Sequence, residues 1–247
     1  MLHFSKNLTA AALLLLACVP TYAVVIQNFD GGSITSASSS LVYAGNAGPS
    51  AGCAGNNALY GEGTYAVAAS ANSCHNLFAP TTAQGGSYFM VVNGNNSSAQ
   101  ANIYSQVVST GITAGAAYNF SAFITGLYVS NPAMLSLRVY DGIGVGGALL
   151  TSLQPFNTNL ATGLNAQGGA TTPAAWVKNS IAFTALSGVV TVQVFNASVA
   201  SQGNDFGLDT LEILQTSTTP ETSATPEPAS FLLAGSVLIG LCLIRRK

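Results

Sequence analysis

The chain has 247 residues, of which 49% are hydrophobic and only 6% are charged. Charge this sparse is unusual for a cytosolic globular protein, in which about a quarter of the residues are charged. Apolar and aromatic residues run through the whole sequence, which excludes an intrinsically disordered chain. Residues 24–228 hold two basic residues against all eight acids, a net charge of −6. They therefore offer no basic stripe to a nucleic acid.

Residues 1–23 have the three parts of a secretory signal peptide. Lys6 supplies a positive charge, residues 8–19 form an apolar signal helix, and the small residues Thr21 and Ala23 predict cleavage after Ala23. A second interpretation stays open, because "LLAC" at residues 15–18 resembles a lipobox and would leave Cys18 as a lipidated N-terminus. Both interpretations predict an exported protein.

The body of the chain, residues 24–215, alternates apolar runs with turn residues. Period-two patterns broken by Asn-Gly, Asp-Gly and Gly-Gly are typical of antiparallel strands. Residues 36–75 are rich in Gly, Ser, Asn and Ala and predict long loops. The fold class predicted is all-β, a single antiparallel β-sandwich or jelly roll. Its predicted strands are 24–29, 88–94, 102–109, 118–129, 134–142, 176–185, 189–196 and 206–214.

Two cysteines, Cys53 and Cys74, lie in this body. An even pair in an exported protein predicts a disulfide bond. Two free thiols or a metal-binding pair are the alternatives, although His75 is the only histidine in the body and a metal site would need more ligands.

The C-terminal region divides into a stalk and an apolar segment. Residues 216–228 are rich in Ser, Thr and Pro and predict an extended linker without a core. Residues 229–244 carry no charge, and Arg245, Arg246 and Lys247 follow. A helix of this length spans roughly 24 Å, which is short for a hydrocarbon core of about 30 Å. Residues 229–247 therefore predict a short transmembrane helix with its basic end in the cytoplasm.

The order of Pro226-Glu227-Pro228, an apolar segment and Arg245-Arg246-Lys247 resembles a PEP-CTERM sorting signal. The resemblance implies a Gram-negative bacterium, export through the secretion machinery and processing by an exosortase, a membrane-embedded cysteine protease. It also implies anchoring in the inner membrane before processing, and release to the cell surface or the extracellular space afterwards. An ordinary single-pass C-terminal anchor is the alternative.

The body also resembles a common type of PEP-CTERM ectodomain, similar to galactose-binding-like and carbohydrate-binding jelly rolls. The similar stretches are "FMVVNG" (89–94), "IYSQVV" (103–108), "AYNFSAFITGLY" (117–128), "PAMLSLRVYDG" (132–142) and "NDFGLDTLEI" (204–213). The resemblance implies a structural Ca²⁺ held by an acid near the first strand and one on the last strand. The matching residues are Asp30 and Asp209, with Asp205 as a further candidate.

The calcium site has an alternative, and the sequence departs from the family there. The usual double acid of the last strand is Asp209-Thr210 in this chain. Asp209 shares a predicted strand face with Leu211 and Ile213, so an inward carboxylate would need a partner. Backbone N–H groups at a turn could supply that partner in place of a metal.

Four aromatic residues on or near predicted strands are candidates for stacking on sugar rings: Tyr104, Tyr128, Tyr140 and Trp176. The alternative for each is a place in the core, and for Trp176 this alternative is favoured. Catalysis has no support, because no sequence motif pairs two acids or gives a nucleophile a base. No cofactor is required by these patterns. The sequence thus predicts a non-enzymatic envelope or extracellular-matrix protein that binds exopolysaccharide, with a structural or adhesive protein without a sugar ligand, or a secreted hydrolase, as alternatives.

Overall fold

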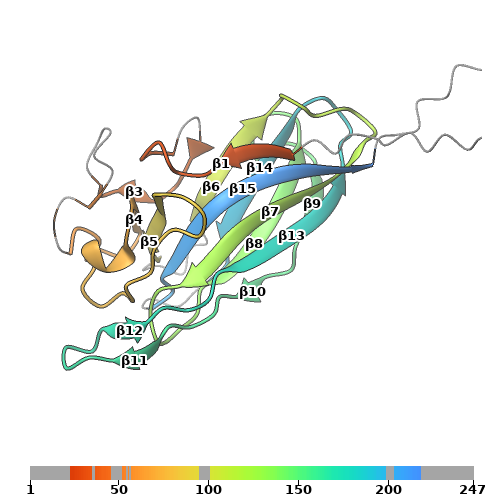
Figure 1. Cartoon of the computed structure of the whole chain (residues 1–247). Helices are drawn as coiled ribbons and strands as arrows, with labels where there is room; N and C mark the ends of the chain where they lie inside the picture. Colours follow the sequence, from red (N-terminus) through yellow and green to blue (C-terminus); the bar gives the residue numbers. More distant parts are fainter. Residues whose placement is uncertain are drawn as a thin grey trace, which may run out of the picture.

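A computed structural model describes residues 23–34, 37–45, 52–53, 55, 57–94, 101–198 and 203–217. These residues form two packed β-sheets and one short hairpin (Figure 1). The strands are β1 (Ala23–Gln27), β2 (Ala37–Ser38), β3 (Val42–Tyr43), β4 (Thr64–Ala68), β5 (Phe89–Asn93), β6 (Ala101–Val108), β7 (Ala117–Gly126), β8 (Met134–Asp141), β9 (Leu149–Ser152), β10 (Phe156–Asn157), β11 (Thr162–Leu164), β12 (Ala170–Thr172), β13 (Val177–Thr184), β14 (Val190–Asn196) and β15 (Phe206–Ser217), with a single turn of 3₁₀ helix, η1, at Ala71–Ser73.

The two sheets have seven and six strands. The larger has the order β13-β7-β15-β5-β4-β3, with β1 also paired to β15, and the smaller has the order β10-β8-β14-β6-β2, with β9 paired to β8. Strands β11 and β12 pair only with each other. All of these pairings are antiparallel except that of β3 with β4, which is parallel. The predicted all-β sandwich is confirmed.

Strand β15 (Phe206–Ser217) has two different partners along one edge. Residues 206–208 pair with β5, and residues 211–214 pair with β1. Between them the ladder with β7 slips, and Thr210 has a φ of 39°. This bulge inserts an extra residue, so the inward positions change from Phe206 and Leu208 to Leu211 and Ile213, all of which are buried.

The predicted strands and the observed strands agree closely in their order along the chain, and the differences lie in residues 36–75 and in residues 149–172, where β9, β10, β11 and β12 were not predicted. All eight predicted strands are present, with ends that differ by a few residues. The region predicted as loops also contains β2, β3 and β4. The predicted signal helix, stalk and transmembrane helix fall outside the described residues. Within the part of the chain described, no helix is long and apolar enough to cross a membrane.

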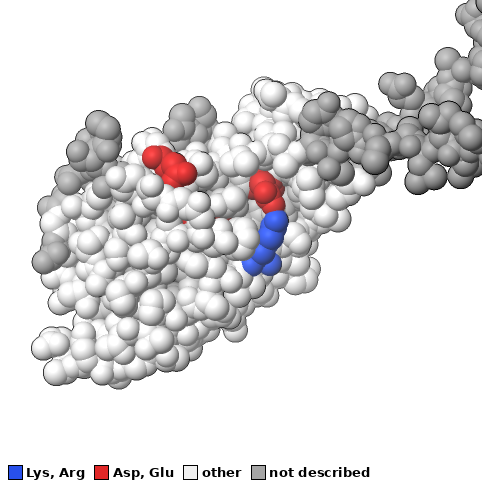
Figure 2. All heavy atoms as spheres, viewed as in Figure 1, with Lys and Arg blue, Asp and Glu red and all other residues white. Residues whose placement is uncertain are grey.

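The main core fills the space between the sheets. Alternate residues of the long strands point inward, for example Leu135, Leu137 and Val139 of β8, and all three are fully buried. Few charges interrupt the surface over this core, and the face in Figure 2 is almost without charged side chains. The low charge seen in the sequence therefore reflects a surface built from small polar residues.

A second, smaller core lies on the other face of β4 and β5. Phe89 and Val91 of β5 point into it, whereas Met90 and Val92 point into the main core, which explains why every residue of β5 is buried. Residues 57–83 cover this face, and Leu59 and Phe78 contribute side chains to it. Burial on both faces explains why β4 and β5 lack a clear period-two pattern.

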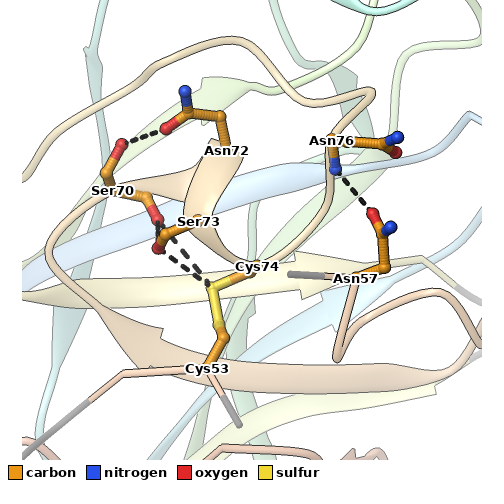
Figure 3. The surroundings of a disulfide bond; sticks show 7 residues. All are labelled: Cys53, Asn57, Ser70, Asn72, Ser73, Cys74 and Asn76. Atoms are coloured by element: carbon orange, nitrogen blue, oxygen red, sulfur yellow. Dashed lines mark hydrogen bonds between the residues drawn. A yellow bond between two sulfur atoms is a disulfide. The ribbon is translucent and has the colours of Figure 1, made fainter. Parts of the chain in front are cut away.

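The disulfide bond Cys53–Cys74 closes this covering segment (Figure 3). Cys74 is fully buried and follows η1, and its backbone carbonyl accepts a hydrogen bond from the N–H of Leu59 at 3.1 Å. The backbone N–H of Asn76 donates to Oδ1 of Asn57 at 2.9 Å, which is a second tie across the same loop. The predicted cysteine pairing is confirmed.

Replacing both cysteines (C53S/C74S) should lower the free energy of unfolding by roughly 3 kcal/mol, because the bond removes loop-closure entropy from the unfolded chain. Urea unfolding of the wild type and the double variant measures this difference. A reducing agent should destabilise the wild type by a similar amount and leave the variant unchanged. Equal unfolding midpoints for the two oxidised proteins would contradict the prediction.

Candidate functional site

A pocket of about 360 Å³ opens at one end of the sandwich. The pairings of Thr64 with Asn93 and of Phe206 with both Val92 and Gly126 bring four strand ends together here. The lining residues come from these ends, from the segments beside them and from the segment after η1: Tyr60, Glu62, His75, Leu77, Phe78, Asn93, Tyr128, Gly203 and Asp205. The volume is at the lower end of the range for small-ligand sites, roughly 300–1,000 Å³.

Three stacked rings form one wall of the pocket. The ring of Tyr60 stacks on His75 with centroids 5.5 Å apart, and His75 stacks on Phe78 at 4.6 Å. Phe78 is anchored in the second core, while Tyr60 is 73% exposed. Through the stack, the buried ring of Phe78 supports the solvent-exposed ring of Tyr60.

His75 is a neutral member of this stack. Its Nδ1 accepts a hydrogen bond from the backbone N–H of Leu77 at 3.2 Å, which fixes the proton of the neutral ring on Nε2. Burial lowers the pKa of His75, because the charged form would lose its hydration. The wall therefore contributes no positive charge at neutral pH.

Two acids, Glu62 and Asp205, share the pocket. Asp205 is 7% exposed, and its Oδ1 accepts the backbone N–H of Gly94 at 3.1 Å. Burial raises the pKa of Asp205 to about 7, the hydrogen bond from Gly94 opposes this rise, and the nearby charge of Glu62 adds to it. Burial also raises the pKa of Glu62, whose Oε2 is buried without a hydrogen-bond partner among the described residues.

The dipeptide Asn93-Gly94 holds Asp205 in place. The side chain of Asn93 donates to the carbonyl of Leu59, which ties the end of β5 to the segment that carries Tyr60. A Cβ atom at position 94 would collide with the side chain of Asn204, so only glycine lets the backbone N–H reach Asp205. This dipeptide therefore ends strand β5 and also fixes two parts of the pocket, the segment before Tyr60 and the carboxylate of Asp205.

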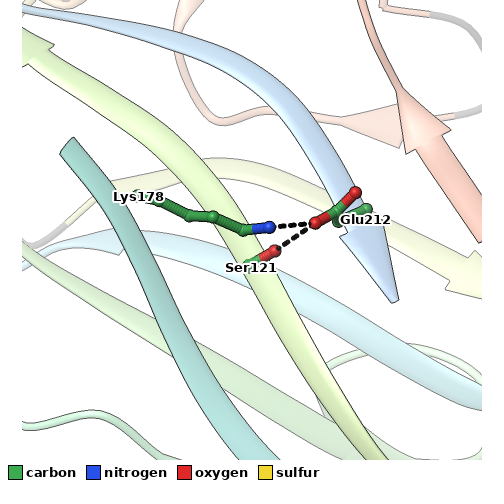
Figure 4. A network of polar contacts seen from close by, with 3 residues as sticks. All are labelled: Ser121, Lys178 and Glu212. Atoms are coloured by element: carbon green, nitrogen blue, oxygen red, sulfur yellow. Dashed lines mark hydrogen bonds and ion pairs between the residues drawn. The ribbon is translucent and has the colours of Figure 1, made fainter. Parts of the chain in front are cut away.

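No Lys or Arg is among the described residues that line the pocket. Lys178 forms an ion pair with Glu212, whose carboxylate also accepts a hydrogen bond from Ser121 (Figure 4). The guanidinium of Arg138 lies 3.6 Å from the centroid of the Phe195 ring. The two basic residues of the body are thus engaged elsewhere, and the pocket acids have no basic partner in the described structure.

The aromatic residues predicted to bind sugar lie in different places. Tyr128 lines the pocket, and its hydroxyl donates to the carbonyl of Gly168 at 3.4 Å. Tyr104 is fully buried in the main core, so its ring cannot stack on a sugar in this fold, because inward-facing positions of β6 pack against the opposite sheet. Trp176 packs on the second core, edge-on to Phe89, and donates Nε1–H to Thr82 at 3.1 Å. The hydroxyl of Tyr140 donates to Gln193 at 3.2 Å on the six-stranded sheet.

The predicted calcium ligands Asp30 and Asp209 both contact the loop before β5. Asp30 accepts the N–H of Ser87 at 2.7 Å, and Asp209 accepts the N–H of Gln84 at 2.8 Å. Burial raises the pKa of Asp209, its hydrogen bonds lower it, and the charge of Asp30 raises it further. The sequence predicted that Asp209 shares a strand face with Leu211 and Ile213. The bulge at Thr210 interrupts this face between Asp209 and Leu211, so that prediction was wrong.

Two carboxylates that contact the same loop suit Ca²⁺ in part, since it prefers six to eight oxygen ligands. Their oxygens already accept backbone N–H groups, the arrangement given above as the alternative. Among the described residues, no group of three His, Cys, Asp or Glu side chains is placed to hold a metal. Calcium bound by Asp30 and Asp209 stays a prediction.

The sequence did not reveal the combination of Tyr60, Glu62, His75 and Asp205. Glu62 and Asp205 are far apart in the chain, Glu62 belongs to no motif, and the sequence singled out Asp205 only as a further calcium candidate. The only local signal was Asn93-Gly94, which reads equally well as a turn. The hydrogen bond from Gly94 to Asp205 becomes visible only once β5 and β15 are paired.

Comparisons with known proteins place the chain's C-terminus in a defined class. Residues 224–247 match the family described as the PEP-CTERM protein-sorting motif. A sorting signal of this kind implies an exported protein that is anchored in the membrane and then processed by an exosortase. No curated protein matches the sequence.

Several solved structures are similar to the body. The CBM22-1 xylan-binding domain from Paenibacillus barcinonensis Xyn10C has 13% identity and a TM-score of 0.45, with 81% of this chain and 100% of that chain covered. The C-terminal domain of EclA, a sugar-binding protein, has 24% identity and a TM-score of 0.32 over 45% of this chain and 66% of that one. The enzymatically active domain of bacteriophage CBA120 tailspike protein 4 has 14% identity and a TM-score of 0.44 over 78% and 21%.

The buried acid of the pocket should make stability depend on pH. The pKa of Asp205 is about 7 in the folded protein and near 3.8 in the unfolded chain, so the folded state binds this proton more tightly. Its stabilising effect is complete below about pH 4 and is lost as the pH rises through 7. D205N should remove this loss and gain up to roughly 4 kcal/mol relative to the wild type between about pH 4 and pH 8.

Denaturant unfolding of both proteins across this pH range measures the effect. The difference between the two profiles separates Asp205 from Glu62 and His75, which titrate in the same pocket. Parallel profiles for the wild type and D205N would show that Asp205 has an ordinary pKa.

Proposed function

We propose that the protein is an exosortase-sorted component of the cell envelope or extracellular matrix, and that its β-sandwich binds a polysaccharide in the pocket between Tyr60 and Asp205. The observation that carries this proposal is the meeting of an exposed aromatic stack with buried hydrogen-bond acceptors in one hollow. Flat rings stack on the C–H faces of pyranoses, while carboxyl and amide groups bind the hydroxyls. Binding without catalysis is the role we assign to the site.

Different residues of the pocket supply the stacking surface and the hydrogen-bonding groups. Tyr60 and Tyr128 supply ring surface at the opening, and Asn93, Glu62 and Asp205 supply polar atoms. The rings and acceptors are held by the second core and by strand pairing, so little order has to be gained on binding. Part of the pocket is thus organised before a ligand arrives.

One observation favours a second candidate, a hydrolase. Glu62 and Asp205 are close enough for the charge of one to raise the pKa of the other, and glycosidases use a pair of acids in which the one with the raised pKa is the general acid. Binding and hydrolysis are distinguished by whether the ligand is recovered intact.

Changing Tyr60 to Ala should weaken binding of the polysaccharide by about tenfold, through loss of the stacking surface. Isothermal titration with polysaccharide from the producing cells measures the affinity. Tyr60→Phe is the matched control, because it keeps the ring and should bind within about twofold of the wild type. Since Tyr60 is 73% exposed, the unfolding midpoint should stay nearly constant in both variants.

Other outcomes would point to other functions. No binding to any glycan, together with self-association of the protein, would replace this proposal with a structural or adhesive role. Release of glycan fragments by the wild type, absent in D205N, would identify a hydrolase.

Changing Glu227 to Ala should leave the C-terminal tail attached in cells that contain an exosortase, because the acid between two prolines is the polar feature that the enzyme can recognise. Mass spectrometry of the exported protein measures whether the tail is present. Glu221→Ala removes the same charge outside the matched residues 224–247 and should be processed normally. Normal processing of Glu227→Ala would remove the role assigned to this residue.

A further inference from the structure

We propose that the pocket selects a sugar with a free amino group, that is, a hexosamine residue whose nitrogen is not acetylated and carries a positive charge. This inference rests on the proposed function, since it names the class of sugar that the pocket would bind. It follows from the charge balance of the pocket and from the kind of surface that faces its acids.

The pocket has two acidic groups, and no basic residue balances them among the described residues that line it. Asp205 is more than nine-tenths buried, and among the described residues its carboxylate accepts one hydrogen bond, from Gly94. The buried Oε2 of Glu62 accepts none from that part of the chain. A buried carboxylate is stable when it is paired with a cation or holds its proton. A ligand that brings a cation would therefore be favoured at this position.

The described part of the chain does not provide this cation. His75 is the basic side chain among the described residues of the lining, and it is held neutral by burial and by the hydrogen bond that its Nδ1 accepts. Lys178 is paired with Glu212, and Arg138 lies over Phe195. An ammonium group on the ligand can supply the positive charge.

The aromatic wall suits a cation as well as a sugar ring. An ammonium group within about 6 Å of a tyrosine or phenylalanine ring is attracted by the negative face of the ring. The stack of Tyr60 on His75 and Phe78 lines the same pocket as the two acids, and Tyr60 is the ring of the stack that is open to solvent. An amino sugar uses both features at once, because its C–H face stacks on the ring while its nitrogen donates to a carboxylate.

The same arrangement disfavours the other common sugar classes. A uronic acid would bring a third negative charge to Glu62 and Asp205, at an energetic cost. An acetamido group carries no charge and adds bulk where the carboxylates would receive the ammonium. A neutral hexose can donate hydroxyl groups, but such hydrogen bonds are weaker than those between two charged groups.

The test compares two oligosaccharides that differ only at nitrogen: a β-1,4-linked glucosamine tetrasaccharide and its fully N-acetylated counterpart. Titration calorimetry with the purified exported protein near pH 7 measures both affinities. We expect the free-amine tetrasaccharide to bind at least tenfold more tightly, with an affinity that falls as salt is raised. Glu62→Gln and Asp205→Asn should each lower its affinity by about tenfold, a clearly larger loss than either variant causes for the N-acetylated form.

Asp141→Asn is the control for charge, since it removes one negative charge from a residue outside the pocket lining. Its affinity for both oligosaccharides should match the wild type, and circular dichroism should show that all three variants are folded. Equal binding of the two oligosaccharides, or equal losses in all three variants, would overturn the selectivity and leave glycan binding intact. Failure of both oligosaccharides and of every neutral and acidic glycan to bind would overturn the proposed function as well.

Discussion

The arrangement of the whole body depends on the pairing of strand β15. Its residues pair with β7 along one edge and, along the other, with β5 before the bulge at Thr210 and with β1 after it. In a regular twelve-residue strand, Phe206 and Leu208 would lie on one face and Leu211 and Ile213 on the other. Two of these four residues would then leave the core. The bulge keeps all four inside and lets two short strands share one edge. Because β5 leads to β4 and the second core, the same pairing also sets where the pocket forms.

The pocket follows from that register through the residue just before β15. Phe206 is opposite Val92, so Asp205 comes to lie beside Asn93 and Gly94. Asn93 in turn binds the carbonyl of Leu59, one residue before Tyr60. The stacked wall, the glycine donor and the buried acid are therefore parts of one connected unit. The raised pKa of Asp205 is the electrostatic cost of placing a carboxyl group there.

The sequence predicted the parts of the fold whose signal is local. Strands such as β8 and β14 were found because their apolar residues alternate or are β-branched, and the disulfide because only two cysteines lie in the body. Strand β4 was missed because its sequence, "TYAVA", is mostly small and is buried on both faces, which removes the alternation. The site was missed for a different reason. Glu62 and Asp205 are joined by strand pairing between distant segments, and no local pattern records that pairing. Tyr128, the predicted sugar-stacking residue that does line the pocket, was one of several aromatics with the same local pattern, and Asp205 was singled out only as a candidate for calcium.

The direction of β15 also relates the pocket to the sorting signal. Asp205 lies just before the strand begins, and Ser217 at its end leads toward the matched residues 224–247. A strand of twelve residues extends roughly 40 Å, so the pocket and the exit of the chain toward the tail lie at opposite ends of the sandwich. The pocket is thus far from Ser217, the residue from which the chain continues toward the tail. A polymer outside the cell could then be bound before or after the tail is processed, because neither event requires the same end of the domain.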